Sequence, residues 1–423
     1  MLEGEIEVKG SKNAALAALA SSLLFSAPGG SVFGGKKPPV FLNLPDIEDI
    51  KRMRELISSI SANGRLNQEI AKRFRASILV VGPLLARFGK AAFPHPGGCV
   101  IGARPIDVFI DGWKEMGAKV KSEIRSTKSE ILNYELIAKN GLRGIDYTFR
   151  TQSVTGTEGL MMTALLAKGG TTLRNCAMEP EIKYLAKFLN QNGADIRGAG
   201  MATIHISGRD GKLLDAAAVP FINPPDRIEA GTLAILGALA ARELLIKNFP
   251  TGELGALISA LKDADVEILP HQSNIMIRRA KNLRAVNIKT KEYPGFATDL
   301  QAPFCVLATQ AAGQSLIHEA IFEGRLAYTE DLNRMGAHIV LERYGVDAAR
   351  RGSRPRRAVV SGPTPLYGRD LESPDLRAGL AFVIAALIAE GESKIGNIYQ
   401  IDRGYEKIDE RLRAVGAEIV RVD

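Results

Sequence analysis

The chain has 423 residues, 46% hydrophobic and 24% charged, which is ordinary for a globular protein with room for two domains. Its cysteines, Cys99, Cys176 and Cys305, are too few and too scattered for a disulfide framework, which favours a reducing compartment. The charged N-terminus MLEGEIEVKG has no signal-peptide core, and no apolar run reaches the length of a membrane span. We therefore expect a cytoplasmic protein.

A net charge of +8 raises the question of nucleic acid binding. Five of the arginines lie together in ARRGSRPRRA, residues 349–358, so the rest of the chain is only mildly basic. This stretch has no interleaved aromatic residues for base stacking and reads as a solvated surface loop. The sequence thus predicts anionic small-molecule substrates and no nucleic acid or membrane partner.

One pattern recurs along the chain: a capping or charged cluster, an apolar helix, a small-residue break and a short β-like run. The copies start at residues 11, 75, 155, 226, 297 and 373, as in SKNAALAALASSLL and DRIEAGTLAILGALAARELLIKN. Regular recurrence of this kind indicates a repeated structural unit. We predict six such units.

A second pattern runs in phase with the first, an amphipathic helix that ends in Gly-Ala and enters a strand. Glycine at a helix end followed by a β-branched run is typical of this transition. The clear copies are WKEMGAKVKSEI, FLNQNGADIRGAG, LNRMGAHIVLE and LRAVGAEIVRV, and LKDADVEIL and ELISSISANGRL are weaker ones.

Six units taken as two sets of three would form two similar α/β domains. If the helices of each domain run parallel, their positive N-terminal ends converge on one face. We therefore expect an anion-binding cleft between the domains, suited to phosphate and carboxylate.

Basic residues recur at the unit junctions. Any one of them alone is more often part of a surface ion pair, but arginine can also hold carboxylate or phosphate with two hydrogen bonds. The set favours the second interpretation, and its members are Lys12, Arg75, Arg104, Arg227, Arg325, Arg377 and Arg403.

Asp299 in YPGFATDLQA follows a Pro-Gly turn and begins a helix. It is either an N-terminal helix cap or a general base at the cleft, and Asp107 and Asp375 carry the same ambiguity. The five histidines show no metal-ligand spacing and no CxxC occurs, so we predict no metal and no cofactor. The glycine-rich stretch at residues 29–38 fits no nucleotide-binding motif.

Cys99 lies in HPGGCVIGARPID, behind Gly97 and Gly98 and five residues before Arg104. A lone cysteine is most often a small buried hydrophobic residue, which fits Cys176 and Cys305. In a glycine-rich, mobile loop near a cation, however, a thiol becomes a nucleophile or proton donor. We predict a functional Cys99.

Together these motifs closely resemble the UDP-N-acetylglucosamine enolpyruvyl transferases (1-carboxyvinyltransferases) of the EPSP synthase family. The resemblance covers nearly the whole chain, and PGGCxIGARPxD is its most specific part. The other motifs are KGSKNAAL, RASILVVGPLLARFG, EPEI, PDRIEAGT, YPGFATDLQA, FEGR, DLRAG and IYQIDRGYE.

The resemblance implies an inside-out α/β barrel of two domains, each of three repeated units. Residues 12–224 would form the first domain with the Cys99 loop, and residues 1–11 plus 225–423 the second. The implied protein is a monomer in the cytoplasm. Its substrates would be phosphoenolpyruvate and UDP-N-acetylglucosamine, whose 3′-hydroxyl accepts the enolpyruvyl group as phosphate is released. This is the first committed step of peptidoglycan synthesis, and so serves cell-wall biogenesis, cell shape and cell division.

The resemblance also implies residue roles. Lys12, Asn13, Arg104 and Arg403 would hold phosphoenolpyruvate, Cys99 would protonate its methylene carbon, and Asp299 would accept the sugar hydroxyl proton. Arg227, Arg325 and Arg377 would be further cleft residues. The UDP-sugar would contact Arg75, Arg104, Pro105, Ile106, Asp107, Val108, Thr151, Gln152, Ser153, Val154, Asp299 and Ile321.

Four places depart from the family pattern: residues 26–42 look long, residues 57–74 short, residues 344–358 carry the Arg-rich insertion, and Gly324 stands where Asn is usual. Two alternatives remain: transfer to shikimate-3-phosphate, and a non-catalytic protein whose insertion binds nucleic acid. Retention of Cys99, Lys12, Asp299 and Arg403 argues against the latter.

Overall fold

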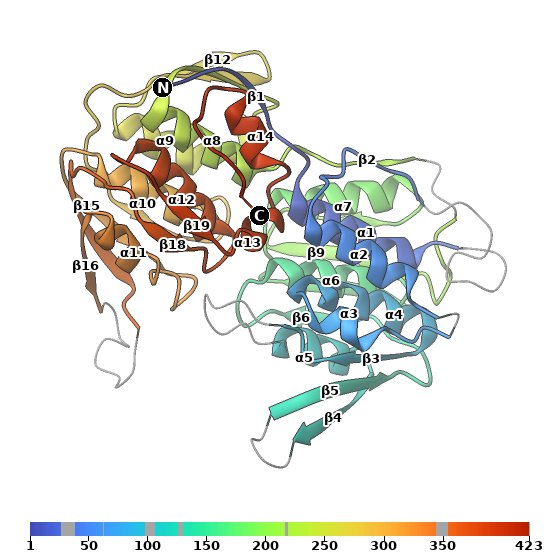
Figure 1. The fold of residues 1–423 in the computed structure, drawn as a ribbon. Helices are drawn as coiled ribbons and strands as arrows, with labels where there is room; N and C mark the ends of the chain where they lie inside the picture. The colour runs from blue at the N-terminus through green and yellow to red at the C-terminus, as the bar shows by residue number, and fades with distance from the viewer. Residues whose placement is uncertain are drawn as a thin grey trace. The chain divides into compact units, whose positions relative to one another are not determined.

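The computed structural model describes residues 1–26, 39–61, 63–97, 106–125, 130–215, 219–343 and 354–422. Its described residues divide into two compact units, each with its own hydrophobic core. We call residues 10–97 plus 106–224 the N-terminal unit, and residues 1–9 plus 225–422 the C-terminal unit. The first is drawn mainly in blue to green and the second mainly in yellow to red in Figure 1.

The N-terminal unit contains three sheets, with strand orders β10-β2, β3-β5-β4 and β6-β7-β9-β8. Its strands are β2 (Phe41–Leu42), β3 (Lys90–Pro94), β4 (Lys119–Arg125), β5 (Glu130–Ile137), β6 (Asp146–Thr148), β7 (Gly170–Arg174), β8 (Ile196–Arg197), β9 (Thr203–Ser207) and β10 (Phe221–Ile222). Its helices are α1 (Lys12–Ser21), η1 (Ser22–Leu24), α2 (Glu48–Ser58), α3 (Gln68–Lys72), η2 (Arg75–Val80), α4 (Val81–Phe88), α5 (Asp107–Glu115), α6 (Val154–Ala164) and α7 (Pro180–Gln191).

The C-terminal unit also contains three sheets, β1-β11-β13-β12, β14-β15-β17-β16 and β18-β19. Its strands are β1 (Leu2–Glu7), β11 (Ala241–Lys247), β12 (Ile268–His271), β13 (Asn274–Ile277), β14 (Ile288–Lys289), β15 (Gly313–His318), β16 (His338–Glu342), β17 (Arg357–Gly362), β18 (Asp370–Glu372) and β19 (Lys394–Gly396). Its helices are α8 (Arg227–Ala240), η3 (Thr251–Glu253), α9 (Gly255–Asp263), η4 (Thr298–Leu300), α10 (Gln301–Thr309), α11 (Thr329–Arg334), α12 (Leu376–Ile388), α13 (Tyr399–Asp402) and α14 (Ile408–Arg413).

The three four-stranded sheets share one topology. In each, the first strand pairs parallel with the second, the second pairs antiparallel with the third, and the third pairs antiparallel with the fourth. A parallel neighbour requires a crossover connection, whereas the antiparallel pairs allow short hairpins. The sheets therefore repeat one unit in both halves of the chain.

The apolar helices form the interior of each unit. All 14 residues of α8 and all nine of α10 are buried, and α8, α10 and α12 contact one another. A helix that is hydrophobic all round must be surrounded by protein. All six predicted apolar helices are confirmed, and in each unit they lie inside while the sheets lie outside.

The predicted helix-to-strand transition is confirmed for four of the six amphipathic helices, three of which end in Gly-Ala. Gly117, Gly193 and Gly336 adopt positive φ at the ends of α5, α7 and α11, and a strand follows each. In LKDADVEIL, Asp265 takes the position that glycine has in the other three helices. Its φ is 68°, a conformation that aspartate tolerates better than most residues.

Two predicted strands are wrong. The helix of LRAVGAEIVRV forms as α14, but residues 418–422 have no ladder, and Val420 and Val422 are exposed. Likewise α2 of ELISSISANGRL ends at Ser58, and the described residues between it and α3 form no strand. An alternating pattern becomes a strand only where a neighbouring edge offers hydrogen bonds, and local sequence does not encode that edge.

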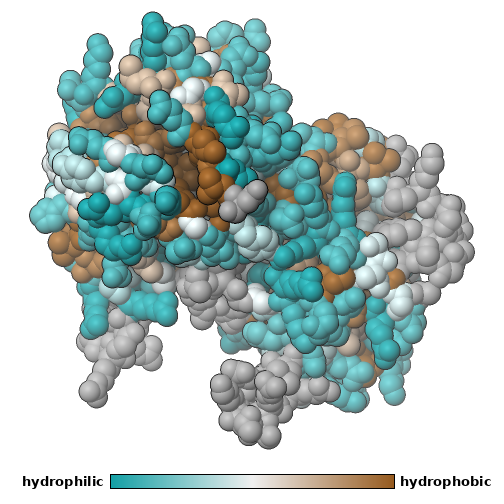
Figure 2. All heavy atoms as spheres, viewed as in Figure 1, coloured by the Kyte–Doolittle hydropathy of each residue, from teal (hydrophilic) through white to brown (hydrophobic). Residues whose placement is uncertain are grey.

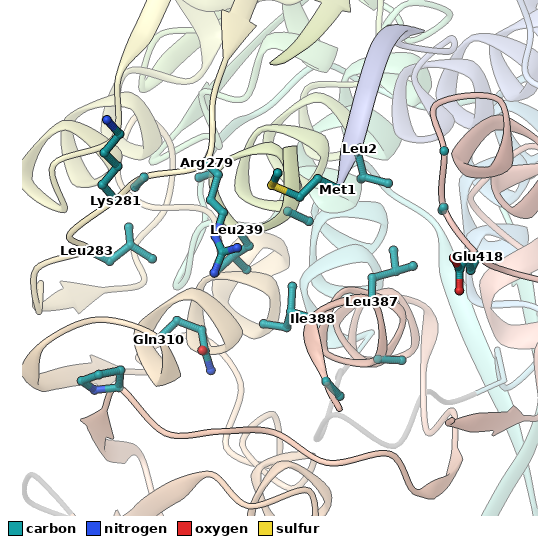
Figure 3. A pocket seen from close by; sticks show the side chains of 18 of the residues that line it. Met1, Leu2, Leu239, Arg279, Lys281, Leu283, Gln310, Leu387, Ile388 and Glu418 are labelled. Atoms are coloured by element: carbon teal, nitrogen blue, oxygen red, sulfur yellow. The ribbon is translucent and has the colours of Figure 1, made fainter. Parts of the chain in front are cut away.

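The C-terminal ends of α8, α10 and α12 surround a pocket of about 670 Å³ in the C-terminal unit. Figure 3 shows Leu239, Leu387 and Ile388 lining it beside the exposed Arg279 and Lys281. Elsewhere the visible surface of each unit is largely hydrophilic, although apolar side chains gather around a hollow in the C-terminal unit (Figure 2). Among the described residues, no helix combines the length and the apolar character that crossing a membrane requires.

Candidate active site

The N-terminal ends of the core helices in the C-terminal unit carry charged residues that sequence reasoning selected. Arg227 is the first residue of α8, Arg377 the second of α12, and Asp299 lies in η4 just before α10. The repeated unit therefore places equivalent positions of three helices at one end of the core, opposite to the pocket at their C-terminal ends. We call Arg227, Asp299, Arg325, Arg377 and Tyr405 the Asp299 cluster.

Asp299 lies between two guanidinium groups. Arg325 Nη2 donates to Asp299 Oδ1 at 2.5 Å, and Arg377 Nε lies 3.7 Å from the same oxygen. The arginine side chains are only 5% and 7% exposed, whereas that of Asp299 is 31% exposed. The carboxylate is thus open to solvent from one side and fixed by buried cations on the other.

The charge balance at Asp299 favours its ionised form. Burial alone would raise the pKa of this carboxyl, but the positive charges of Arg325, Arg377 and Arg227 outweigh burial and hold the pKa well below its usual range. In turn, Asp299 helps to raise the pKa of Arg325 against the opposing effect of burial. The cluster therefore holds an anion within a net positive environment.

Aromatic side chains hold two of the arginines. Arg377 Nη1 donates to the Tyr405 hydroxyl at 2.9 Å, and its guanidinium carbon lies 5.4 Å from the centre of the same ring. Arg227 lies over Tyr293 at 5.7 Å. Contacts with an aromatic face restrict a guanidinium without neutralising it, so both side chains stay positively charged in a fixed orientation.

The structure resolves which aspartates are helix caps. Asp375 Oδ1 accepts the backbone N–H groups of Arg377 and Ala378, so Asp375 caps α12, as Asp226 caps α8. The η4–α10 start has no side-chain cap, and Asp299 points instead to the arginines. Asp107 is exposed as the first residue of α5 and caps nothing.

Sequence reasoning missed a buried carboxylate beside the cluster. Glu319 follows β15, is fully buried, and accepts the hydroxyl hydrogen of Thr298, the residue before Asp299. An acid directly after the strand-like segment GQSLIH was the available signal, since a carboxylate buried there needs hydrogen-bonding partners. Ile321 lies two residues on and donates its N–H to Glu319 Oε1 at 2.8 Å.

Arg403 lies at the end of α13 in the C-terminal unit. Its Nη1 donates to Gln400 Oε1 at 3.0 Å, and the residue is half-buried. The contact lies within one helical turn and fixes the start of the IDRGYE segment.

In the N-terminal unit, Lys12 is the first residue of α1 and only 8% exposed. Its Nζ lies 2.7 Å from Asp49 Oδ2 in α2, and the Asp49 side chain is 4% exposed. Asn13 follows, half-buried. Asp49, which sequence reasoning also missed, provides the counter-charge for a buried ammonium.

Two segments assigned to the sugar nucleotide come together at the starts of α5 and α6. Ser153 caps α6 by accepting the N–H of Gly156, and a Cβ added at Gly156 would lie 3.3 Å from Val108 Cγ2. Ile106 precedes α5 as a buried residue, while Thr151 is exposed and Gln152 and Val154 are half-buried. Glycine at position 156 thus lets the two helix N-termini approach closely.

Arg75 begins η2 and lies near His95. Burial lowers the pKa of His95, and the positive charge of Arg75 lowers it further. The imidazole is therefore neutral at physiological pH.

Cys99, Arg104 and Pro105 lie outside the described residues. Gly97 has a packing role, because an added Cβ would come 2.5 Å from the carbonyl oxygen of Lys72, and the expected mobility of the loop stays a prediction. Cys176 and Cys305 are free, fully buried thiols whose pKa burial raises to about 12, which confirms their interpretation as inert core residues. Within the described ranges, no three His, Cys, Asp or Glu side chains are arranged to hold a metal.

A family model described as EPSP synthase (3-phosphoshikimate 1-carboxyvinyltransferase) matches residues 1–412. The chain belongs to the EPSP synthase family. This membership confirms the resemblance drawn from the sequence motifs.

Curated relatives match this chain over nearly their full length. UDP-N-acetylglucosamine 1-carboxyvinyltransferase of Solibacter usitatus is 42% identical over 440 residues, covering 100% of this chain and 97% of the relative. The protein of the same name from Koribacter versatilis is 40% identical over 442 residues, covering 100% and 94%.

Solved structures of enolpyruvyl transferases and EPSP synthases share the fold. The enolpyruvyl transferase NikO from Streptomyces tendae gives a TM-score of 0.82 at 22% identity, covering 99% of this chain and 95% of that one. EPSP synthase from Acinetobacter baumannii gives 0.66 at 17% identity, covering 98% and 96%. The predicted enolpyruvyl transferase fold is confirmed.

Proposed function

We propose that this chain is an enolpyruvyl transferase that moves the enolpyruvyl group of phosphoenolpyruvate to the 3′-hydroxyl of UDP-N-acetylglucosamine and releases phosphate. This is the first committed step of peptidoglycan synthesis. The observation that carries the proposal is the match, at 40–42% identity over the whole chain, to relatives named for this acceptor. The Asp299 cluster supports it, because the reaction needs a base beside fixed cations.

Phosphoenolpyruvate would be held by Lys12 with Asn13, Arg104 and Arg403. Its phosphate and carboxylate suit an ammonium and two guanidinium groups. The position of Lys12 at the positive N-terminal end of α1 supports this role, since a helix N-terminus attracts anions.

In the addition step, the Cys99 thiol would give its proton to the methylene carbon of phosphoenolpyruvate while the sugar oxygen bonds to the neighbouring carbon. Asp299 would accept the hydroxyl proton. The resulting tetrahedral intermediate keeps both carboxylate and phosphate, so the same cations stabilise it. Loss of a proton from the new methyl group and departure of phosphate would then restore the double bond.

A carboxylate surrounded by arginines is a weak base, because its low pKa reduces the driving force for taking a proton. Binding of anionic substrates near Arg325, Arg377 and Arg227 would offset part of their positive charge. Asp299 would then become more basic when the site is filled, which suits a base that must act only on bound substrate.

The UDP-sugar would contact two neighbouring segments of the N-terminal unit. The approach of Val108 to the start of α6 supports a shared role for Ile106, Asp107 and residues 151–154. The family resemblance implies five further contacts, which are Arg75, Arg104, Pro105, Asp299 and Ile321.

The same proposal covers the cellular location, the oligomeric state and the roles of the two units. We assign the protein to the cytoplasm, as a monomer whose N- and C-terminal units are the two enolpyruvyl-transferase domains. A nucleic acid role for the Arg-rich stretch is disfavoured, because Arg356 pairs with Glu323 at 2.7 Å and Arg357 pairs with Glu342 at 2.7 Å.

One assay tests the proposal: phosphate release from phosphoenolpyruvate with UDP-N-acetylglucosamine or shikimate-3-phosphate as acceptor. We expect release that depends on the UDP-sugar. Release only with shikimate-3-phosphate would favour the other acceptor, which the family model's description names. No release with either would contradict an enzymatic role.

A further inference from the structure

Glu319 has no part in the reaction steps proposed for this chain. It is fully buried in the C-terminal unit and accepts four hydrogen bonds. Oε1 accepts from the Thr290 hydroxyl at 3.0 Å and from the N–H groups of Ile321 and Phe322 at 2.8 and 3.0 Å. Oε2 accepts from the Thr298 hydroxyl at 2.8 Å. Four donors satisfy both oxygens of a carboxylate that would be costly to bury without hydrogen-bonding partners.

The Oε2 contact continues to Asp299. With its hydrogen committed to Glu319, the Thr298 hydroxyl offers its lone pairs, and Arg325 Nη1 donates to it at 3.0 Å. Arg325 Nη2 then donates to Asp299 Oδ1 at 2.5 Å. Because a guanidinium is planar, these two bonds fix its orientation. The direction of one hydroxyl proton, set by Glu319, thus determines how Arg325 faces the carboxylate.

The Oε1 contacts shape the segment after β15. They hold the backbone of Ile321 and Phe322 in a tight turn, and the ring of Phe322 lies 5.4 Å from the guanidinium carbon of Arg325. One buried carboxylate therefore supports Arg325 from two directions, through Thr298 and through Phe322.

We propose that Glu319 is a positioning residue, which orients the base Asp299 through Thr298 and Arg325 and holds the Ile321 turn for the sugar nucleotide. This inference rests on the proposed function. Glu319 does not touch the reacting atoms; it limits the positions that the base can adopt. Misplacement of a catalytic group by about 1 Å can lower turnover about 100-fold, so loss of this support is measurable.

The test compares Glu319→Gln, Thr298→Val and Thr298→Ser in the full-length protein, by phosphate release with UDP-N-acetylglucosamine. Glutamine keeps the size of Glu319 but presents an NH₂ group where an acceptor is required. We expect kcat to fall about 100-fold in Glu319→Gln and Thr298→Val, with the KM for phosphoenolpyruvate within about twofold of wild type. Thr298→Ser keeps the hydroxyl and should retain at least about half of the wild-type kcat.

The double variant Glu319→Gln/Thr298→Val decides whether the two residues act through one link. We expect it to be no slower than the slower single variant, because either change already breaks the chain to Arg325. Multiplicative losses would show independent action and overturn the inference.

Glu229→Gln is the matched control. Glu229 is also a buried carboxylate of the C-terminal unit, but it faces Arg411 and the Lys9 N–H. We expect lower stability with unchanged kcat. An equal loss of kcat here and in Glu319→Gln would overturn the inference.

The outcomes separate the two proposals. If the wild-type protein releases no phosphate with either acceptor, the proposed function fails. If the wild type is active and Glu319→Gln matches it, only the positioning role fails. Should Glu319→Gln not fold, the Thr298 pair decides: Thr298→Val as active as Thr298→Ser contradicts the inference.

Discussion

At Asp299, burial and charge have opposite effects on the pKa, and the three arginines outweigh burial. The side chain is a third exposed, so a hydroxyl group of a substrate can reach it. The chemistry of this residue is thus set by its neighbours rather than by its place in a helix.

Replacement of Asp299 by Asn should lower kcat by roughly 10²- to 10⁴-fold, because an amide cannot accept the hydroxyl proton. Both substrates should still bind, since removal of a negative charge leaves the arginines free to attract anions. Steady-state phosphate release and calorimetric titration measure the two effects.

The control for Asp299→Asn is Asp331→Asn, which removes a first-turn aspartate paired with Arg334 at 2.9 Å in α11. We expect this control to keep wild-type turnover. Wild-type kcat in Asp299→Asn itself would contradict the role as base.

Cys99 should be the only thiol rapidly alkylated by an epoxide that mimics phosphoenolpyruvate, and the UDP-sugar should speed the reaction by closing the site. Cys176 and Cys305 should remain unlabelled because they are fully buried with a pKa of about 12. Peptide mass spectrometry with and without the UDP-sugar is the measurement. Earlier labelling at either buried thiol, or no effect of the sugar, would show that this interpretation of Cys99 is wrong.

At the scale of elements, α1 begins with a lysine at its positive end, an unfavourable placement. Asp49 of α2 offsets it and joins the two helices. Removal of either partner would destabilise the folded state, because it would leave an uncompensated charge in the interior.

Asp49→Asn should therefore lower the free energy of unfolding by about 3 kcal/mol or more. Asp46→Asn, which breaks an exposed pair with Lys51 just before α2, should cost about 1 kcal/mol or less. Denaturant titration of both variants gives the comparison. Equal costs would mean that the Lys12–Asp49 pair is not buried in solution.

Helices α6 and α7 bring acids together in the N-terminal unit. Glu158 of α6 is 2% exposed, and its Oε1 has no hydrogen-bond partner among the described residues. Burial raises its pKa well above the ordinary value, and the charges of Glu181 and Glu179 raise it further. Just above the unfolded pKa, the folded state therefore binds a proton that the unfolded state has lost.

The free energy of unfolding falls as pH rises from the unfolded pKa of about 4.3 towards the folded pKa, because the folded state binds more protons in this range. The slope is at most about 1.4 kcal/mol per pH unit. Glu158→Gln should remove this loss, so the variant should exceed wild type at pH 7–8 and the difference should vanish near pH 4. Unfolding titrations across this range test it, with exposed Glu115→Gln as control. A difference independent of pH would contradict the prediction.

At the scale of the whole molecule, the two hydrophobic cores share no residue. The chain enters the C-terminal unit first, as β1 pairs with β11, and returns to it at residue 225. Leu2, Ile6 and Val8 are buried in that core, so the C-terminal unit needs both ends of the chain to be complete.

Deletion of residues 1–9 should speed amide hydrogen exchange in β11 and β13 while α1, α4 and α6 keep wild-type protection. The reason is that β11 loses its parallel neighbour and part of its apolar cover. Mass spectrometry of exchanged peptides is the measurement, with Glu3→Gln, an exposed change on β1, as control. Faster exchange spread equally over both units would contradict separate cores.

Much of the fold is predictable from contiguous sequence. The six apolar helices, the glycine-ended amphipathic helices and the inert cysteines follow from local periodicity, caps and backbone preferences, which act within a few residues. The charged residues at the repeat junctions were also visible as a set, because a repeat brings equivalent positions to equivalent places.

Only the tertiary structure decided which residues meet. Residues far apart in the chain form the contacts of Asp299, of the Lys12–Asp49 pair and of the buried Glu319. Two predicted strands were wrong for the same reason, because the neighbours that would complete their hydrogen bonds come from elsewhere. A side chain's charge state and a strand's pairing depend on the groups that packing brings to them, and no short stretch of sequence contains those groups.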